Sequence, residues 1–576
     1  MGCCIRWVQL VVVCCALTTP AAAAPKSIID LQLFRTTSSI KINNVSGKEG
    51  NATLINLHPP TNSWYLLRLN RGDGTPEEVY HLQNGSPRTQ SLFLQENYPE
   101  GLTIIRGKEK VLCDLWGTGK SEALTQARKS SVPYAPLCGG EVYLRNSTKG
   151  HQSAVEAVTD FLRTEVPGGE QVVTIVRDTL YAYLYQKKAG QRLETKTEQE
   201  ALQSPAVNGP LSAALDPGRA NEIVKAPDLG IELDESISNG MTPGCWYAAS
   251  GNAGVYVSVI VPGWIAPEIL KNYKQSVNSM DNVESGQIVY LIAFDLARFD
   301  LHYALGTMHP GVGWSGHIQS RMQDTSLPGP DGIGASAPLI RTGLINPVDA
   351  QRTVAAFSGG FKRYHGAFKY GPLAEQNHGS HYGFLQEGVL FSTLQPDLAT
   401  IYVLNDGRAA MKTWSAQDDN LLSGIRYARQ NGVPIIDGID PTTHVPVPGR
   451  FVNRWGPGNW SGSADEKLET MRAAAALQES NRGRFLLYAF FWSATPSAMA
   501  RVFQAYHCNY AMLLDMNALV HTYAAVYKRE GTKLYVRHLI RRMNESDIAV
   551  DGRYIPRFLG FADDRDFFYL TRKESP

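Results

Sequence analysis

Apolar residues are concentrated in short, dense runs along the second half of the chain. The runs are rich in β-branched and aromatic residues and are bounded by Gly, Pro, Asn or Asp, which is the pattern of buried β-strands. We predict strands at residues 254–261, 287–295, 300–306, 353–357, 400–404, 433–436, 484–490 and 510–515. The run at 300–306 is expected to pair with the run at 287–295. A helix, with apolar residues at helical spacing, is predicted at residues 497–506.

The first third of the chain has shorter apolar runs separated by turns. Ser153 precedes residues 154–163, whose apolar spacing predicts a helix, and residues 171–176 predict a buried strand. Between about residue 194 and residue 234 the composition changes to Pro, Ala, Asn and Gly, with few large apolar side chains. We therefore expect an α+β protein dominated by strands. Its four segments would be a signal peptide at 1–23, an N-terminal α+β domain of unknown role at 24–195, a linker at 196–240 and a strand-rich domain at 241–576.

The N-terminus has the pattern of an export signal. Arg6 precedes an apolar run at residues 7–17, and small residues follow it up to Pro25. Cleavage is expected after Ala23, because Pro25 directly after the cut would hinder the peptidase. No other apolar run reaches the roughly 18 residues that a membrane span needs. The mature protein is therefore expected to have no membrane span and to be secreted or periplasmic/extracytoplasmic.

Charge and motif spacing argue against several partners. The chain holds 55 Lys and Arg against 54 Asp and Glu, and this balance leaves no electrostatic footprint for nucleic acid. Residues 117–121 are Gly-Thr-Gly-Lys-Ser, but a phosphate loop needs a glycine where Asp114 stands, so a surface turn is expected. His378 and His381 offer two imidazoles, whereas zinc sites need three or four ligands. We predict no metal site and no cofactor, and leave a divalent cation open.

Four cysteines remain after the signal peptide, as suits an oxidising compartment. Four cysteines allow three pairings. We favour Cys113–Cys138, which closes a short loop in the first domain, together with Cys245–Cys508, which joins the ends of the second. The alternative is four free buried thiols.

The strand at 510–515 ends in Asp515, and Asn517 and His521 follow at once. A carboxylate at the end of a strand is held rigidly by the sheet, so strand ends are common mounts for active-site acids. This stretch is the first candidate for catalytic chemistry.

The second candidate is the strand at 353–357, which runs into Ser358-Gly359-Gly360. Two glycines let a backbone come close to a ligand. The sequence around Ser358 also resembles a nucleophile elbow, which keeps a Ser-His-Asp hydrolase open, with Asp515 and His521 as partners. An elbow needs a helix after the serine, and the Gly- and aromatic-rich residues 361–371 do not predict one.

These landmarks together resemble the phosphodiester glycosidase family over roughly residues 285–530. The family pattern has a strand running into Asn-Gly-Gly-Phe-Phe, and here the corresponding residues are 358–362, with Ser358 in place of Asn. An Arg in a small-residue strand corresponds to Arg472, and a final strand into Asp-Gly-Gly-Gly-Ser corresponds to Asp515-Met-Asn517-Ala. The resemblance implies a strand around 472–477, whereas the capping box at 463–466 predicts a helix over 464–480.

The resemblance implies a hydrolase that cleaves a glycosyl phosphodiester or related glycosidic bond in an extracellular or envelope glycan. Such cleavage passes through an oxocarbenium-like state that a carboxylate stabilises, and the phosphate needs cationic or N–H donors. The implied catalytic residues are Asp515 as the carboxylate, Arg472 as the phosphate contact and His521 as a proton carrier. The implied substrate contacts are Ser358, Gly359, Gly360, His381 and Asn517.

A protein of another class fits the same sequence. Ten tryptophans and 26 tyrosines are enough to supply sugar-stacking surfaces for a non-catalytic secreted carbohydrate- or envelope-binding protein on the same fold. Turnover of a glycosyl phosphodiester distinguishes the two possibilities.

Overall fold

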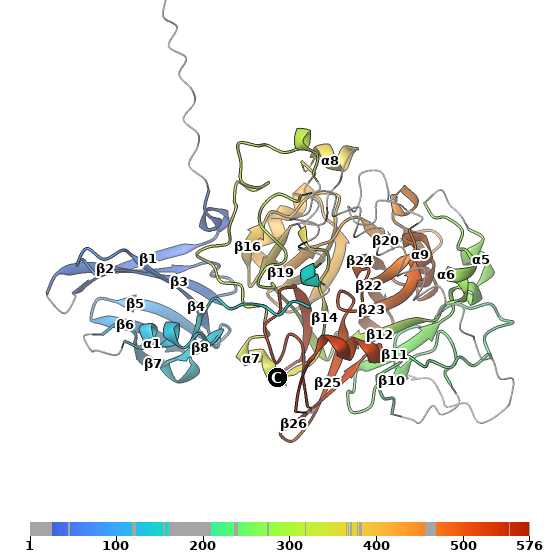
Figure 1. The fold of residues 1–576 in the computed structure, drawn as a ribbon, viewed down its shortest axis with the longest axis horizontal. Coiled ribbons are helices and arrows are strands. Elements are labelled where there is room, and N and C mark those ends of the chain that lie inside the picture. Colours follow the sequence, from blue (N-terminus) through green and yellow to red (C-terminus); the bar gives the residue numbers. More distant parts are fainter. Residues whose placement is uncertain are drawn as a thin grey trace, which may run out of the picture.

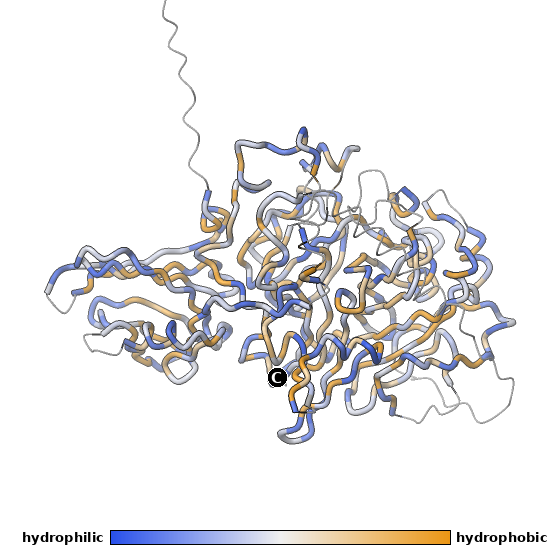
Figure 2. Tube along the Cα trace, viewed as in Figure 1, coloured by the Kyte–Doolittle hydropathy of each residue, from blue (hydrophilic) through white to orange (hydrophobic). Residues whose placement is uncertain are grey.

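The computed structural model describes residues 26–574 apart from 44–46, 118–121, 154–155, 159–160, 162–208, 235–239, 273–275, 317, 364–365, 367, 369–370, 377, 380–382, 455–467 and 552. Strands dominate the described residues and the helices are short, so the strand-rich α+β class is confirmed. Among these residues, none of the helices has the length and apolar character needed to cross a membrane. Figure 2 shows hydrophobic stretches alternating with hydrophilic ones along the described part of the trace.

The N-terminal unit consists of two antiparallel sheets with a core of their own (Figure 1). The six-stranded sheet has the order β1-β2-β3-β4-β9-β8, and the three-stranded sheet has the order β5-β6-β7. Helix α1 (Ala123–Lys129) packs on β8. The strands are β1 (Thr36–Asn43), β2 (Glu49–Asn56), β3 (Trp64–Asn70), β4 (Glu78–Asn84), β5 (Gln90–Gln95), β6 (Tyr98–Arg106), β7 (Glu109–Asp114), β8 (Tyr134–Leu137) and β9 (Val142–Arg145).

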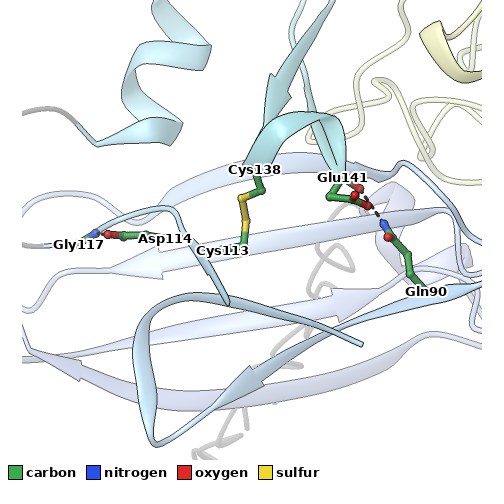
Figure 3. The surroundings of a disulfide bond; sticks show 6 residues. All are labelled: Gln90, Cys113, Asp114, Gly117, Cys138 and Glu141. Carbon is green, nitrogen blue, oxygen red and sulfur yellow. Dashed lines mark hydrogen bonds between the residues drawn. A yellow bond between two sulfur atoms is a disulfide. The ribbon is translucent and has the colours of Figure 1, made fainter. Parts of the chain in front are cut away.

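A disulfide joins the two N-terminal sheets. Cys113 on β7 is bonded to Cys138 directly after β8, with 5.6 Å between the Cα atoms (Figure 3). The predicted Cys113–Cys138 pair is therefore confirmed, and the alternative of four free thiols is wrong.

The second predicted bond is not formed, because Cys245 and Cys508 are both free thiols. Cys508 is buried in the core next to Tyr506. Cys245 is half-buried and hydrogen-bonded to Ser212. The two thiols thus lie in different surroundings. An even number of cysteines does not by itself bring two of them into the geometry that a disulfide needs.

The remainder of the chain is built around an eight-stranded antiparallel sheet in the order β10-β11-β12-β23-β22-β24-β20-β21. Its central strands are buried along most of their length. The strands are β10 (Tyr247–Ala248), β11 (Val255–Ile260), β12 (Val289–Asp295), β20 (Pro434–Ile439), β21 (Pro446–Pro448), β22 (Thr470–Ser480), β23 (Gly483–Ala494) and β24 (Tyr510–Met516).

Two five-stranded sheets and a small hairpin complete the fold. One sheet has the order β13-β29-β14-β25-β26, the other β16-β15-β19-β17-β18, and β27 pairs with β28. The strands are β13 (Phe299–Ala304), β14 (Thr353–Ser358), β15 (Phe384–Gln386), β16 (Val389–Ser392), β17 (Ala399–Leu404), β18 (Ala409–Thr413), β19 (Ile425–Gln430), β25 (Ala524–Glu530), β26 (Lys533–His538), β27 (Ile548–Val550), β28 (Arg553–Ile555) and β29 (Phe567–Arg572).

The helices of this part are short, with one exception. Helix α9 (Pro496–Ala505) begins at the cap Thr495 and is buried at all of its positions. The predicted helix at 497–506 is therefore confirmed, and it packs against β20 and β21. The others are α5 (Pro267–Leu270), α6 (Asn282–Gly286), α7 (Pro347–Ala350) and α8 (Pro372–Gln376).

The predicted pairing of residues 300–306 with residues 287–295 is wrong. Strand β12 pairs with β11 and β23, whereas β13 lies in another sheet beside β29. The two sheets pack face to face, because Phe357 of β14 stacks on Phe294 of β12 at 6.4 Å between ring centroids. As a result, β12 and β13 are both buried along nearly their whole length. Neither strand needs to pair with the other in order to be buried.

Residues 470–480 form a strand, which decides between the two expectations for this stretch. Strand β22 pairs with β23 on one side and β24 on the other. Its alanines are fully buried in the middle of the sheet, so tertiary packing overrides the helical propensity of the sequence.

The described part of the predicted linker is packed onto the large unit. Residues 209–234 form bridges such as Val224 with Met241 and Leu229 with Ile540, and Val224 and Leu229 belong to the main core. Residues 1–23, the strand predicted at 171–176 and the boundary at 195 lie outside the described residues. The domain limits therefore stay a prediction.

Candidate active site

The structure brings together the ends of β14 and β24, the two strands that the sequence singled out. Both ends meet residues 563–566, which come directly before β29. Because β29 pairs with β14, Ser358 lies opposite Phe567, and the amide of Gly359 donates to the carbonyl of Asp566 at 2.9 Å. Residues 563–566 are Asp, Asp, Arg and Asp, and each is at most 3% exposed. Four consecutive charged residues in the interior require partners from elsewhere.

Arg565 is the central cation of this region. Its Nη1 donates to Oδ2 of Asp515 at 2.5 Å, and its Nε donates to Oε1 of Glu156 at 2.5 Å. The ammonium of Lys362 lies 3.2 Å from the same Oε1 and 3.6 Å from Oδ2 of Asp564. All five side chains are buried, so water screens their charges little. We call these residues, with Ser358, His309, His521 and Asp566, the Asp515 cluster.

Glu156 comes from far away in the sequence, 409 residues before Arg565. The hydroxyl oxygen of Ser153 accepts the amide of Glu156 at 3.2 Å, so the predicted cap is present. Burial alone would raise the pKa of Glu156, but the charges of Arg565 and Lys362 hold that pKa below its ordinary value. Glu156 is therefore a carboxylate that lies between two cations, which is a position suited to an anion.

Six buried polar atoms of the cluster have no hydrogen-bond partner among the described residues. They are Oε2 of Glu156, Nε2 of His309, Oγ of Ser358, both carboxyl oxygens of Asp564 and Oδ1 of Asp566. Nε2 of His309 lies 3.3 Å from Oδ2 of Asp564, within ion-pair range. Buried polar groups are nearly always satisfied in proteins. These atoms therefore mark where a polar ligand or water would complete the hydrogen bonding.

The two glycines after Ser358 allow neighbouring groups to come close to the backbone, and their predicted contact with a ligand stays a prediction. A Cβ on Gly359 would lie 2.5 Å from Oδ2 of Asp566, and a Cβ on Gly360 would lie 3.1 Å from Nη2 of Arg429. Asp566 is held in turn by Nε of Arg429 at 2.8 Å. The groups that come close to these glycines are thus the protein's own side chains, which fix the end of β14.

The protonation states of the cluster follow from its burial. Burial raises the pKa of Asp515 to about 6, against the opposing effect of Arg565. Burial and Arg565 lower the pKa of His521 well below its ordinary value, and burial and Lys362 do the same for the pKa of His309. At neutral pH the cluster therefore combines an ionised Asp515 with two neutral imidazoles.

His521 has a defined tautomer. Its Nδ1 lies 2.9 Å from the carbonyl of Met516, and a carbonyl only accepts, so Nδ1 carries the proton. Nε2 then faces Oε1 of Glu156 at 3.8 Å with its lone pair. The imidazole is a base available to the cluster, and it is not held by Asp515, whose oxygens accept from Arg565 and from the amide of Met516.

Arg472 contacts different groups from those predicted. Its Nε donates to the carbonyl of Ala494 at 2.6 Å and its Nη2 to the carbonyl of Leu468 at 2.9 Å. These bonds satisfy backbone carbonyls beside β22, and the predicted phosphate contact of Arg472 stays a prediction. The guanidinium that meets Asp515 is that of Arg565.

Asn517 and His381 are the remaining predicted site residues. Asn517 has a φ of 77°, and its Oδ1 accepts the hydroxyl of Thr470 at 2.8 Å. Asparagine is one of the few residues that adopt this left-handed conformation readily. His381 lies outside the described residues.

Several members of the cluster were not predicted from the sequence: Glu156, His309, Lys362, Asp564, Arg565 and Asp566. One signal was available, because residues 563–566 stand directly against the apolar run Phe567-Phe-Tyr-Leu570. A charged residue at the boundary of an apolar run also identified Asp515, although Asp515 stands at the end of its run and residues 563–566 come before theirs. Nothing local to Glu156 or His309 distinguishes them from surface residues.

One group of acids among the described residues has metal-like spacing. Ligand oxygens of Asp281, Glu284 and Glu469 lie within 4.8 Å of one another. Burial, together with Asp281 and Glu284, raises the pKa of Glu469 to about 7. Acidic groups at such spacing are common without a metal, so the cofactor expectation stays a prediction.

No protein-family model matches this chain, and no curated protein matches it. Among solved structures it is weakly similar to a phosphodiester glycosidase catalytic domain and to two proteins without a stated activity. The first is the catalytic domain of zebrafish N-acetylglucosamine-1-phosphodiester alpha-N-acetylglucosaminidase, auto-inhibited by its pro-peptide. The identity is 11%, the TM-score is 0.29, and the match covers 56% of this chain and 85% of that one.

The other two are a putative exported protein from Burkholderia pseudomallei and a hypothetical protein from Synechocystis. Both have 10% identity and a TM-score of 0.21. The first match covers 49% of this chain and 74% of that one, and the second covers 92% and 98%.

Proposed function

We propose that this chain is an exported hydrolase that cleaves a glycosyl phosphodiester or a related glycosidic bond in an extracellular or envelope glycan. The observation that carries the proposal is the ion pair of Asp515 with Arg565, whose second carboxylate partner, Glu156, also meets Lys362. The cluster is buried, and several of its polar atoms have no hydrogen-bond partner among the described residues. Cleavage between an anomeric carbon and a phosphate oxygen is served by a carboxylate for the cation-like sugar and by cations for the phosphate.

Asp515 is the proposed carboxylate. The bond to the anomeric carbon breaks with its electron pair leaving on the phosphate oxygen, and the sugar becomes cation-like. An ionised carboxylate stabilises or traps that cation. With a pKa of about 6, Asp515 is ionised at neutral pH.

Arg565 and Lys362 are the proposed anion contacts, in place of Arg472. The guanidinium of Arg565 suits bidentate binding of a phosphate, and the ammonium of Lys362 adds a second charge. In the structure, the carboxylate of Glu156 accepts from Arg565 and lies beside Lys362. A phosphate group that binds these two cations displaces this carboxylate. His521, neutral with a free lone pair on Nε2, is the proposed base for the attacking water.

One observation favours the alternative of a non-catalytic binding protein. Arg565 and Lys362 already have Glu156 as a partner, and the Asp515 cluster is buried. A binding protein that never admits a substrate to this cluster would have the same arrangement. A Ser358 hydrolase is less well supported, because Nδ1 of His521 faces Met516 and not Asp515.

The test is turnover of aryl diesters of sugar 1-phosphates, with release of free sugar measured by chromatography. Wild-type chain should release sugar, and Asp515→Asn should not. Absence of turnover on gluco, manno and N-acetylglucosaminyl diesters would leave the binding-protein reading in place.

A further inference from the structure

A cleft of about 690 Å³ lies between the N-terminal unit and the large unit. It is bounded by β1, β2 and β5 on one side and by Asn405 and Arg426 on the other. Figure 1 shows the N-terminal sheets standing beside the sheet that contains β16 and β19. Ligand clefts of several hundred Å³ are typical at such junctions between units. None of the residues that line this cleft belongs to the Asp515 cluster.

The polar wall of the cleft consists of hydroxyls and amides. Thr36, Thr37 and Ser38 present an exposed hydroxyl edge at the start of β1. Across from them, Oδ1 of Asn405 is buried without a hydrogen-bond partner in the described part of the chain, while its Nδ2 donates to the carbonyl of Ser423. A buried amide oxygen without a donor favours a ligand that carries hydroxyl groups.

Phe93 gives the cleft an aromatic surface. Strand β5 alternates, so Leu92 points into the N-terminal core and Phe93 points outward and is 44% exposed. An aromatic face surrounded by hydroxyls and amides binds flat molecules that are apolar on one face and polar at the edge. Sugar rings have this character.

Both arginines of the cleft lie near acids outside its lining. Among the described residues no acidic side chain lines the cleft, and Arg426 is bonded to Glu387 at 2.8 Å. Arg88 is 56% exposed and lies 3.9 Å from Asp300. Arg88 therefore remains the cation best placed to meet a ligand, and it suits hydroxyls as well as an acidic substituent.

We infer that this cleft binds a short oligosaccharide, stacked on Phe93 and hydrogen-bonded by Asn405 and Arg88. The inference does not rest on the proposed hydrolase, since binding here needs no chemistry at Asp515. In a glycan-cleaving protein such a site would hold the glycan at a distance from the reacting bond.

Isothermal calorimetry of the full chain tests the inference with four probes: chitotriose, mannotriose, cellotriose and a heparin tetrasaccharide. At least one should bind with a Kd below ~1 mM. Phe93→Ala and Asn405→Ala should each weaken binding at least ~10-fold. Arg88→Ala should weaken binding of the heparin tetrasaccharide more than binding of the neutral oligosaccharides.

One control keeps the result specific. Tyr554→Ala removes a similarly exposed aromatic outside the cleft and should bind as the wild type does. The inference is overturned if no probe binds, or if Phe93→Ala and Asn405→Ala bind as the wild type does.

Discussion

Asp515→Asn separates chemistry from folding at the centre of the cluster. The amide keeps the size of the carboxyl and removes its charge. Asp515 is one of two carboxylates bonded to Arg565, and Glu156 remains as the other at 2.5 Å. If ionised Asp515 stabilises a cation-like transition state, its loss should lower kcat/KM by at least ~10²-fold, or about 2.7 kcal/mol in barrier.

The stability change should be smaller and should depend on pH. Removing one partner of a buried pair costs about 3–5 kcal/mol when the other is left alone, but Arg565 keeps Glu156. The pKa of Asp515 is raised to about 6 in the folded state. Its contribution to stability is thus present below the unfolded pKa and lost as pH rises through about 6. A shift of about two units is at most ~3 kcal/mol.

The relative stability of Asp515→Asn should therefore improve between pH 4 and pH 7.5, because only the wild type loses this contribution. In the same range the kcat/KM of the wild type should rise through an apparent pKa near 6, as the carboxylate forms. Sugar release and thermal melts over this pH range measure both. Asp349→Asn is the matched control, since Asp349 is a buried carboxyl bonded to Tyr569 and Arg352 outside the cluster. Activity retained by Asp515→Asn with a collapsed melting temperature would refute the catalytic role.

Three further predictions concern the charge balance, the limits of the large unit and the disulfide. Glu156→Gln should bind inorganic phosphate about tenfold more tightly than the wild type, because the carboxylate no longer competes for Arg565. The rise in melting temperature in phosphate relative to chloride measures this, and an equal rise for variant and wild type would contradict it. Fragment 209–576 should melt at a higher temperature than fragment 241–576, because the shorter fragment lacks core side chains such as Val224 and Leu229, which each contribute about 1.5–3 kcal/mol by burial. Identical melting temperatures would show that the contacts of residues 209–240 with the core add little stability. Cys113→Ser should cost the N-terminal unit roughly 3 kcal/mol in denaturant unfolding, and an unchanged midpoint would indicate that the bond adds little.

The strands were predictable because burial on both faces gives runs of apolar residues, and Asp515 was predictable because it ends such a run. The position of β13 was not, because its short connection to β12 favours a hairpin locally while the packing of two sheets separates them. The strand at 470–480 needed tertiary context, since an alanine-rich sequence favours a helix on its own.

The cations of the site were harder to predict than its carboxylate. Arg472 was assigned through family resemblance, yet it bonds backbone carbonyls. Arg565 stands in a run of acids that is typical of a solvated loop. Its burial depends on Glu156 and Asp515, which are distant in sequence, and no local pattern reports such pairing.

The ion pairs of Arg565 also bear on how fast the protein unfolds. Its bond with Glu156 closes a loop of 409 positions, and the entropy of closing long loops must be overcome before non-local contacts contribute. We expect such contacts to form after the rate-limiting step of folding. Substitutions in the Asp515 cluster should therefore show φ-values near zero, speeding unfolding while leaving the folding rate almost unchanged. The lifetime of the native state would then be set in large part by the same charges that are proposed to carry the chemistry.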